Sequence, residues 1–400
     1  MRAAVCSALM GTLLSAGGSA QEVRALWVTR WDYTSPEHVT AIMENAASLH
    51  FNVVLFQVRG NATAFYPSAI EPWAWELTGD DASSTGQDPG WDPLALAVEE
   101  AHARGLEIQA YMNVFPAWRS QDYPPRDSGQ LWWTHPEWFM VDAAGHRMVP
   151  RDHRFTPYPD WYAFISPGVP EVQDHLGSVF EEVARNYEID GIHFDYIRYP
   201  FEIHEVAEGY EERQRALGNW SYDPVSLRRF TEETGVETPD ASPEAWIDWR
   251  CQQITDTLRQ IRERVDAVRP GLHLSAAVMP EPEDARRTKN QDYLRWLREG
   301  LLDSIQTMGY TSSNEVFARR LGALGAQFLA RGWFVPGMSL GNDAGTVEAQ
   351  IAIARETEGA SGFAGFAYSH LFDRDNGHVR TALAEALAGG ALAEPAETPW

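Results

Sequence analysis

The sequence predicts a (β/α)8 barrel, also called a TIM barrel, and three observations support this fold class. Eight short apolar runs of strand length recur along the chain, and helical patterns separate them. Connections from a helix to the next strand are short, whereas several connections from a strand to the next helix are long. No glycine-rich phosphate-binding turn follows the first strand, which argues against the alternative, a doubly wound open sheet.

The eight apolar runs have the length of strands and are rich in β-branched and aromatic residues. They span residues 23–29, 52–58, 107–115, 191–197, 273–279, 303–310, 333–340 and 362–369. Strands that alternate with helices in this way are typical of βα units, and eight such units close into one barrel.

Helical patterns follow the strands and carry start and stop signals. Ser35 suits an N-cap, Pro36 suits the first helical position, and Gly105 suits the end of the second helix. The patterns span residues 36–50, 93–105, 172–187, 245–268, 292–300, 316–332, 346–359 and 377–390.

Loop lengths indicate which face of the barrel carries a functional site. About thirty residues follow the second strand, about fifty-five the third and about forty-five the fourth. Barrel enzymes place their sites at the carboxyl ends of the strands, where such loops gather. We expect one catalytic domain over residues 21–388 and a disordered, glycine-rich and polar tail over 389–400.

The net charge limits the possible binding partners, and the N-terminal segment indicates the cellular location. The net charge of −25 argues against nucleic acid, whose recognition draws on clustered Lys and Arg. Residues 1–20 combine an early Arg, an apolar stretch and a small-residue ending, as in a secretory signal peptide cut after Ala20. No other segment approaches the length of a membrane span. We expect a secreted or periplasmic monomer.

The segment "DGIHFDYIRYP", residues 190–200, contains the main catalytic candidate. Asp195 falls near the end of the fourth apolar strand, where an ionised carboxylate is costly to bury without a partner. Strand alternation puts His193 and Asp195 on one side of that strand. The end-of-strand position favours a catalytic carboxylate. The structural alternative is an Asp that caps a turn or pairs with Arg198.

Several segments resemble the glycosyl-hydrolase-like family 10 barrels, also called the DUF187 or YngK-like family. The segments are "RALWVTRWDYTS", "FNVVLFQVRG", "DPLALAVEEAHARGLEIQAYMNV", "HPEW" and "DGIHFDYIRYP". The resemblance runs from about Val23 to Phe372 and implies secretion, a carbohydrate substrate such as a polysaccharide or peptidoglycan glycan strand, and hydrolysis. That family often has "DDY" where this chain has Asp195 followed by Tyr196, so this chain lacks a second carboxylate at that position.

Aromatic and polar residues near the strand ends agree with sugar chemistry. Ten of the 16 Trp fall between Trp27 and Trp161, many of them in the long loops, and flat aromatic faces suit sugar rings. The alternative for any one Trp is the core of a loop. The substrate-binding candidates are Trp31, Asp32, Arg59, Asn113, Trp118, His193, Tyr196, Arg198, Tyr310 and His370.

Glycoside hydrolysis needs a second carboxyl group beside Asp195. Glu281 is the first carboxylate after the fifth strand, whose neighbour is the fourth, and we expect Trp-rich loops to dehydrate it and raise its pKa. Competing candidates are Asp32, Asp343 and Asp373, and the alternative for Glu281 is a solvated acidic loop.

Metal and cofactor chemistry has weaker support in the sequence, and we expect no metal and no cofactor. There is no zinc-binding H-E-x-x-H pattern, no Cys cluster and no G-x-S-x-G nucleophile elbow. Asp152, His153 and His193 are weak ligand candidates. The resemblance, together with the two carboxylate candidates, leads us to expect a glycoside hydrolase. A glycan-binding barrel without activity and an acyl- or metal-dependent hydrolase on the same fold remain alternatives.

Overall fold

The computed structural model describes residues 20–79, 81–120, 122–143, 145, 147–148, 162–200, 220–328 and 332–400. Nearly all of the predicted signal segment 1–20 lies outside the described residues, as do Asp152, His153 and Trp161. Among the described residues, no helix is long and apolar enough to cross a membrane.

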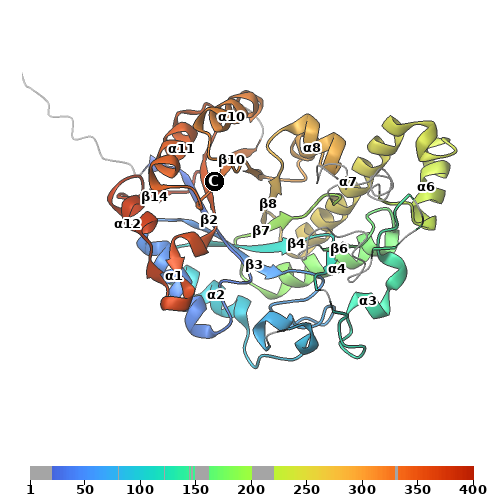
Figure 1. Cartoon of the computed structure of the whole chain (residues 1–400), viewed down its shortest axis with the longest axis horizontal. Helices are drawn as coiled ribbons and strands as arrows, with labels where there is room; N and C mark the ends of the chain where they lie inside the picture. The colour runs from blue at the N-terminus through green and yellow to red at the C-terminus, as the bar shows by residue number, and fades with distance from the viewer. Residues whose placement is uncertain are drawn as a thin grey trace, which may run out of the picture.

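Eight parallel strands close into a barrel, so the predicted fold class is confirmed (Figure 1). The strands are β2 (Val23–Val28), β3 (Val53–Arg59), β4 (Glu107–Asn113), β7 (Gly191–Asp195), β8 (His273–Val278), β9 (Ser304–Met308), β10 (Trp333–Ser339) and β11 (Gly362–Phe366). Their spatial order follows their sequence order, and β11 pairs with β2 to close the ring. Each predicted apolar run coincides with one of these strands, and only β3 extends past its run, by one residue.

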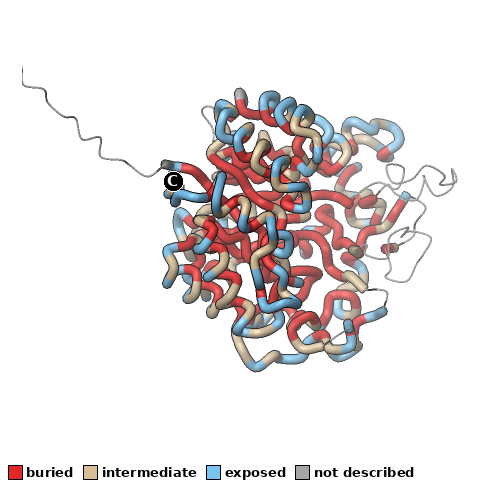
Figure 2. Tube along the Cα trace, turned by 60° about the vertical axis from the view of Figure 1, so that its left-hand side comes forward, coloured by how far each residue is buried: buried red, intermediate tan, exposed pale blue. Residues whose placement is uncertain are grey.

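The main helices surround the barrel and match the predicted helical patterns. They are α1 (Pro36–Ser48), α2 (Pro93–His102), α4 (Pro170–Asn186), α7 (Pro243–Val268), α9 (Tyr293–Arg298), α10 (Asn314–Phe328), α11 (Ala344–Glu356) and α12 (Ala382–Gly389). Ser35 occupies the N-cap position of α1, although no side-chain cap bond is present. Figure 2 shows buried segments in the interior and exposed turns at the periphery.

Short elements that the sequence did not indicate occupy the connections between the barrel units. Helices are α3 (Leu131–Thr134), α6 (Pro224–Thr234) and α8 (Pro282–Lys289), and strands are β5 (Pro116–Trp118), β6 (Ala163–Phe164), β12 (Phe372–Asp373) and β13 (Val379–Arg380). Single 3-10 turns are η1 (Trp75–Leu77), η2 (Ala82–Ser84), η3 (Pro136–Trp138), η6 (Pro239–Ala241), η7 (Tyr368–His370) and η8 (Arg374–Asn376).

The barrel interior is filled by its own apolar layer, separate from the core between strands and helices. Trp27 occupies this interior with residues such as Leu55 and Val335. Gly337 on β10 gives the indole room, because an added Cβ would lie 3.0 Å from the Trp27 ring and 2.1 Å from the Thr307 carbonyl oxygen. The inner layer makes the barrel a packed core rather than a pore.

The C-terminal segment packs against the floor of the barrel, so the prediction of a disordered tail over 389–400 is wrong. Strand β14 (Ala396–Glu397) pairs in parallel with β1 (Ala20–Gln21). The Trp400 indole donates to Glu107 Oε2 at 2.9 Å and lies 4.5 Å from the His273 ring. The polar, glycine-containing composition predicted disorder. The Trp400 side chain nevertheless packs against His273 and Trp333 at the starts of two barrel strands.

Candidate active site

Asp195 is the last residue of β7 and lies at the carboxyl-terminal face of the barrel, here called the mouth. The Tyr111 hydroxyl donates to its Oδ2 at 2.8 Å and the Tyr196 backbone N–H to its Oδ1 at 2.6 Å. The Arg198 guanidinium lies 3.4 Å from Oδ1. The residue is 8 % exposed, so three donors orient a carboxylate that keeps some access to solvent. The pairing with Arg198 considered as the structural alternative is present as one of these three contacts.

Tyr111 is a site residue that sequence reasoning missed. Its side chain points from β4 into the barrel, where burial, followed by the charge of Asp195, holds its pKa well above its usual value. The hydroxyl therefore keeps its proton and acts as a donor to Asp195. Period-two alternation along "QAYMN" (109–113) places Tyr111 on the same face as Asn113, so the sequence carried a signal for it.

Below Asp195, a chain of hydrogen bonds crosses the barrel and fixes the state of His193. The Trp27 indole can only donate, and it donates to His193 Nε2 at 3.0 Å. His193 Nδ1 therefore carries the proton and donates to Ser275 Oγ at 2.8 Å, which in turn donates to Gln109 Oε1 at 2.7 Å. Burial lowers the pKa of His193 to about 3, so the ring is neutral. The structure places His193 in the packed interior rather than at the predicted substrate-binding surface.

Tyr196 turns the chain sharply after the catalytic candidate. Its φ of 50° lies in the left-handed region, which is unusual for a bulky side chain and is found at sites where the fold imposes a special geometry. This turn points the Tyr196 backbone N–H at Asp195. The ring is covered by Arg198, whose guanidinium carbon lies 4.3 Å from its centroid, and lies 5.1 Å from the Tyr162 ring.

Aromatic side chains surround the mouth near Asp195. Tyr310, after β9, is 36 % exposed and stacks on Phe366 at 5.3 Å between ring centroids. Partial burial, and then the charge of Asp195, hold the pKa of Tyr310 well above its usual value. Trp27 approaches both rings from the barrel interior. The mouth therefore offers apolar ring surface beside a carboxylate.

Trp31 extends the aromatic surface along the rim, and two arginine side chains lie over its ring. The side chain is 39 % exposed after β2, in accord with the predicted position at a strand end. The guanidinium carbons of Arg30 and Arg119 lie 4.5 and 5.0 Å from its ring, and Arg119 also lies 5.5 Å from Tyr162. Tyr162 and Arg119 were not predicted, because they come from the long β4–α4 connection whose path the sequence does not reveal.

Three other predicted substrate-binding residues are buried structural groups. Arg59 is fully buried and binds Glu71 through two hydrogen bonds of 2.6 and 2.7 Å. Asn113 donates to the Gly60 carbonyl oxygen at 2.8 Å. Trp118 is 1 % exposed and donates to the Asp122 carbonyl oxygen at 2.9 Å. These three side chains hold the long loops in place. For Trp118 this is the loop-core role considered as the alternative to sugar binding.

Glu281 lies at the N-cap position of α8, directly after β8, and β8 does pair with β7. Its side chain is 54 % exposed, and its Oε1 lies 3.2 Å from Nε of Arg320 on α10. The expectation that loops dehydrate this carboxyl group is wrong, because it points to solvent and to a cation on an outer helix.

Asp32 has the burial that was expected of Glu281. It is 3 % exposed after β2, and Thr29 donates to Oδ2 through its backbone N–H at 2.6 Å and its hydroxyl at 2.9 Å. Burial outweighs these donors and raises the pKa of Asp32 to about 6. A carboxyl group that titrates there can hold a proton near neutral pH, as a general acid requires.

His370 and the other competing carboxylates lie on the rim. His370 is exposed in η7, and a Cβ placed on Gly341 would lie 3.2 Å from its ring. Asp343 caps α11 by accepting from the Thr346 N–H at 3.1 Å, and Asp373 is exposed. Within the described ranges, no group of three or more His, Cys, Asp or Glu side chains is arranged to hold a metal ion.

Comparison with protein families decides the affiliation. The model of the family described as "Glycosyl hydrolase-like 10" matches residues 22–328. This chain belongs to the glycosyl hydrolase-like 10 family. Asp195 and the residues that contact it fall inside the matched range, as do Trp31 and Asp32, so the resemblance seen in the sequence motifs is confirmed.

Two relatives carry names that match this family. "Glycosyl hydrolase YngK" of Bacillus subtilis is 27 % identical over 329 residues, which cover 74 % of this chain and 55 % of that protein. "Glycosyl hydrolase DigH" of Escherichia coli K12 is 24 % identical over 349 residues, 75 % of this chain and 68 % of that protein. The chain thus spans about half the length of the B. subtilis relative.

Solved structures share the fold at low identity. A β-galactosidase from Marinomonas ef1 has a TM-score of 0.59 at 13 % identity and covers 92 % of this chain and 59 % of its own. An α-L-fucosidase from Paenibacillus thiaminolyticus has a TM-score of 0.58 at 17 % identity, with 93 % and 49 % covered. At these identities the likeness shows the barrel fold and nothing finer.

Proposed function

We propose that this chain is a glycoside hydrolase that cleaves O-glycosidic bonds of a polysaccharide or of a peptidoglycan glycan strand. The observation that carries the proposal is the Asp195 carboxylate, held by three donors at the mouth of a barrel whose family is glycosyl hydrolase-like. In this role Asp195 attacks the anomeric carbon or activates a water molecule.

The acid that protonates the leaving oxygen is either Glu281 or Asp32. Glu281 follows the strand next to Asp195, but its side chain is 54 % exposed and pairs with Arg320 on an outer helix. Asp32 is buried with a pKa of about 6, which is the protonation behaviour the role requires, but it follows a strand farther round the barrel. The separation of the two carboxyl groups in a substrate complex would also predict stereochemistry, retention near about 5 Å and inversion near about 6.5–9.5 Å.

Arg119 at the mouth supports an anionic glycan within these substrate classes. The whole chain has a net charge of −25, yet Arg119 lies against the Trp31 and Tyr162 rings. Arg30 and Arg198 also lie against rings of the mouth, but they are buried and pair with Glu76 and Asp195. Arginine recognises carboxylates, which occur in acidic polysaccharides and on the muramic acid units of peptidoglycan. Peptidoglycan lies outside the cytoplasmic membrane, so we also propose that the protein is secreted or periplasmic and acts as a monomer.

Release of reducing ends from purified glycans tests the proposal. The unchanged chain should produce new reducing ends over time, and Asp195→Asn should reduce the rate about a thousand-fold or more while leaving glycan binding intact. Asp190→Asn is the matched control, because Asp190 lies next to the other end of the same strand, where it accepts from the Ile108 N–H at 2.8 Å. Equal activity of the Asp195 and Asp190 variants would contradict the proposal.

A glycan-binding barrel without turnover is the second candidate. Two observations favour it. Glu281 is exposed and paired with Arg320, and Asp195 is followed by Tyr196 rather than by a second carboxylate. A leaving-group series separates the candidates: loss of the acid should slow a natural alcohol leaving group far more than an activated aryl one. Glu281→Gln and Asp32→Asn tested in parallel would identify the acid, and binding without release of any product would favour the binding protein.

A further inference from the structure

The Arg59 side chain uses all three of its nitrogen atoms inside the protein. Its Nε and Nη2 donate to Glu71 Oε2 and Oε1 at 2.7 and 2.6 Å. Its Nη1 donates to the backbone carbonyl oxygen of Asn113 and, at 3.0 Å, to that of Val114. Because Arg59 is fully buried, these contacts hold the planar guanidinium in a single orientation.

The two carbonyl groups lie where β4 ends, beside the end of β7. Asn113 is the ladder partner of Asp195. The peptide unit between Asn113 and Val114 accepts from Arg59 through its oxygen and donates through its N–H to the Asp195 carbonyl oxygen at 2.8 Å. One rigid peptide therefore connects the guanidinium to the backbone of Asp195, and the positive charge on its oxygen strengthens the N–H as a donor.

The same strand also holds the carboxylate itself. Tyr111 on β4 donates to Asp195 Oδ2 at 2.8 Å. The ladder between β3 and β4 is irregular between Gln57 and Arg59, and its last pair is Arg59 with Met112. Such irregularities are frequent next to active sites. Beyond this pair, the Arg59 side chain holds β4 in place of regular pairing.

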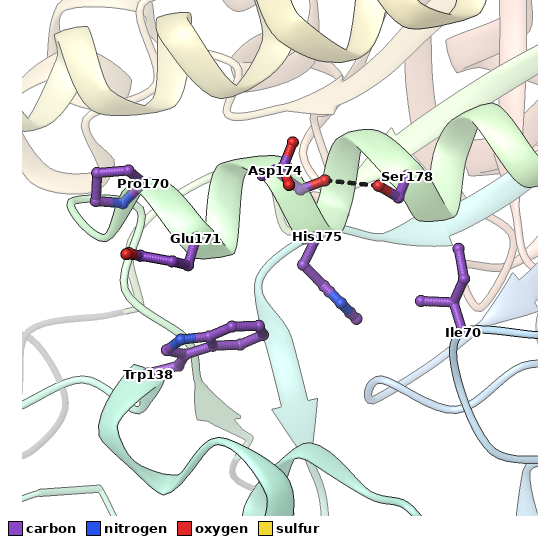
Figure 3. A pocket seen from close by; sticks show the side chains of 7 residues that line it. All are labelled: Ile70, Trp138, Pro170, Glu171, Asp174, His175 and Ser178. Carbon is purple, nitrogen blue, oxygen red and sulfur yellow. Dashed lines mark hydrogen bonds between the residues drawn. The ribbon is translucent and has the colours of Figure 1, made fainter.

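Glu71 anchors the guanidinium from within the protein. Although burial opposes ionisation, Arg59 and then His175 hold the pKa of Glu71 at about 2, so the anchor is charged. His175 Nε2 lies 3.0 Å from Glu71 Oε1. Figure 3 shows His175 projecting from α4, where it lines a cavity on the flank of the barrel. A continuous series of contacts thus runs from this flank to Asp195.

We propose that Arg59 is a positioning residue for Asp195. Anchored by Glu71, it fixes the end of β4 and thereby the place and orientation of the Asp195 carboxylate at the mouth. The inference rests on the proposed role of Asp195 in hydrolysis. Displacement of a reacting group by about 1 Å can cost about a hundred-fold in rate, so a buried side chain that acts only through β4 can control turnover.

Arg59→Lys tests the proposal, because lysine keeps the buried positive charge for Glu71 but has a single nitrogen atom. One nitrogen cannot serve both carboxylate oxygens and both carbonyl oxygens, so β4 loses part of its support. We expect kcat to fall about ten-fold with KM within about two-fold, since a fully buried Arg59 does not bind substrate. Amide hydrogen exchange at Val114 should accelerate about ten-fold, because its contact with Asp195 is loosened.

Arg24→Lys is the matched control at the floor of the barrel. Arg24 is also buried, and it donates from Nε to Glu22 Oε2 and from Nη1 to the Glu394 carbonyl oxygen, both at 2.6 Å. The melting temperature should fall by a similar amount in the two variants, because similar contacts are lost. In the control, kcat and the exchange rate at Val114 should stay within about two-fold of the unchanged chain.

Glu71→Gln is the second variant, should Arg59→Lys fail to fold, and we expect it to lower kcat about three-fold with KM unchanged. Equal kcat in the Arg59 and Arg24 variants would overturn the proposal. Faster exchange at Val114 without loss of kcat would also overturn it, since Arg59 would then hold β4 without serving Asp195. If the unchanged chain shows no turnover, selective exchange at Val114 would contradict the hydrolase proposal and leave the positioning of Asp195 standing.

Discussion

The two ends of the barrel differ in how far their aromatic side chains are packed against other residues. At the floor, the Trp400 ring lies 4.5 Å from His273 and 5.8 Å from Trp333, and its indole donates to Glu107. At the mouth, Trp31 and Tyr310 remain 39 % and 36 % exposed. The aromatic side chain at the floor packs against the barrel and closes it. The aromatic side chains at the mouth remain accessible to solvent. This contrast indicates that exposure of the mouth is a functional property and not a failure of packing.

Asp32→Asn gives the largest expected effect, a change in the pH dependence of stability. The pKa of Asp32 is raised to about 6 from an ordinary 3.8, so between these values the folded state binds the extra proton. This group therefore makes the unchanged chain lose stability as pH rises from 4 to 6, by up to about 3 kcal/mol. Asn cannot titrate. The stability of the variant relative to the unchanged chain should therefore increase as pH rises over that interval. Urea unfolding at pH 4.5 and 7 measures the difference, and parallel profiles would show that Asp32 is not buried in solution.

Trp400→Ala should show that the floor contributes to stability and not to turnover. Removing a half-buried indole and its hydrogen bond should lower the free energy of unfolding by about 2 kcal/mol. Turnover should stay within about two-fold, because no residue placed at the mouth contacts this side chain. Chemical denaturation and initial rates measure the two quantities, and a parallel fall in kcat would show that the floor governs the site.

Tyr111→Phe tests how far the mouth depends on a single donor. Phenylalanine keeps the ring but removes the 2.8 Å hydrogen bond to Asp195 Oδ2. We expect kcat to fall about ten-fold and the free energy of unfolding to fall by about 1 kcal/mol. The fall in kcat is the decisive readout, because a side chain that only packs would lower stability and leave kcat unchanged. An unchanged kcat would reduce Tyr111 to a packing role.

Trp31→Ala is the counterpart of Trp400→Ala and has the smallest expected effect. The ring is 39 % exposed, so its loss should change the free energy of unfolding by about 1 kcal/mol or less. If the ring stacks on sugar, KM should rise about five- to ten-fold with kcat nearly unchanged. A stability loss as large as that of Trp400→Ala would contradict the proposed difference between mouth and floor.

The sequence predicted the barrel because apolar runs and helical periodicity are local signals. All eight strands and the main helices coincide with predicted segments, and Asp195 lies at a strand end as expected. The surroundings of Asp195 were harder to predict. Its donor Tyr111 comes from another strand, and Tyr162, which lies against the Tyr196 ring, comes from a long connection. Arg59 and Glu281 were misjudged because residue type does not reveal burial: one is enclosed by Glu71, and the other faces solvent.

The pairing of β1 with β14 has a practical consequence for handling the protein. Both segments meet beside the floor, where the barrel strands begin, whereas Asp195 ends β7 at the mouth. An affinity handle or surface linker attached ahead of Ala20 would therefore leave the mouth facing the solution. The same handle fused after Trp400 would displace an indole that seals the barrel. Immobilisation for glycan-binding measurements should accordingly use the β1 side.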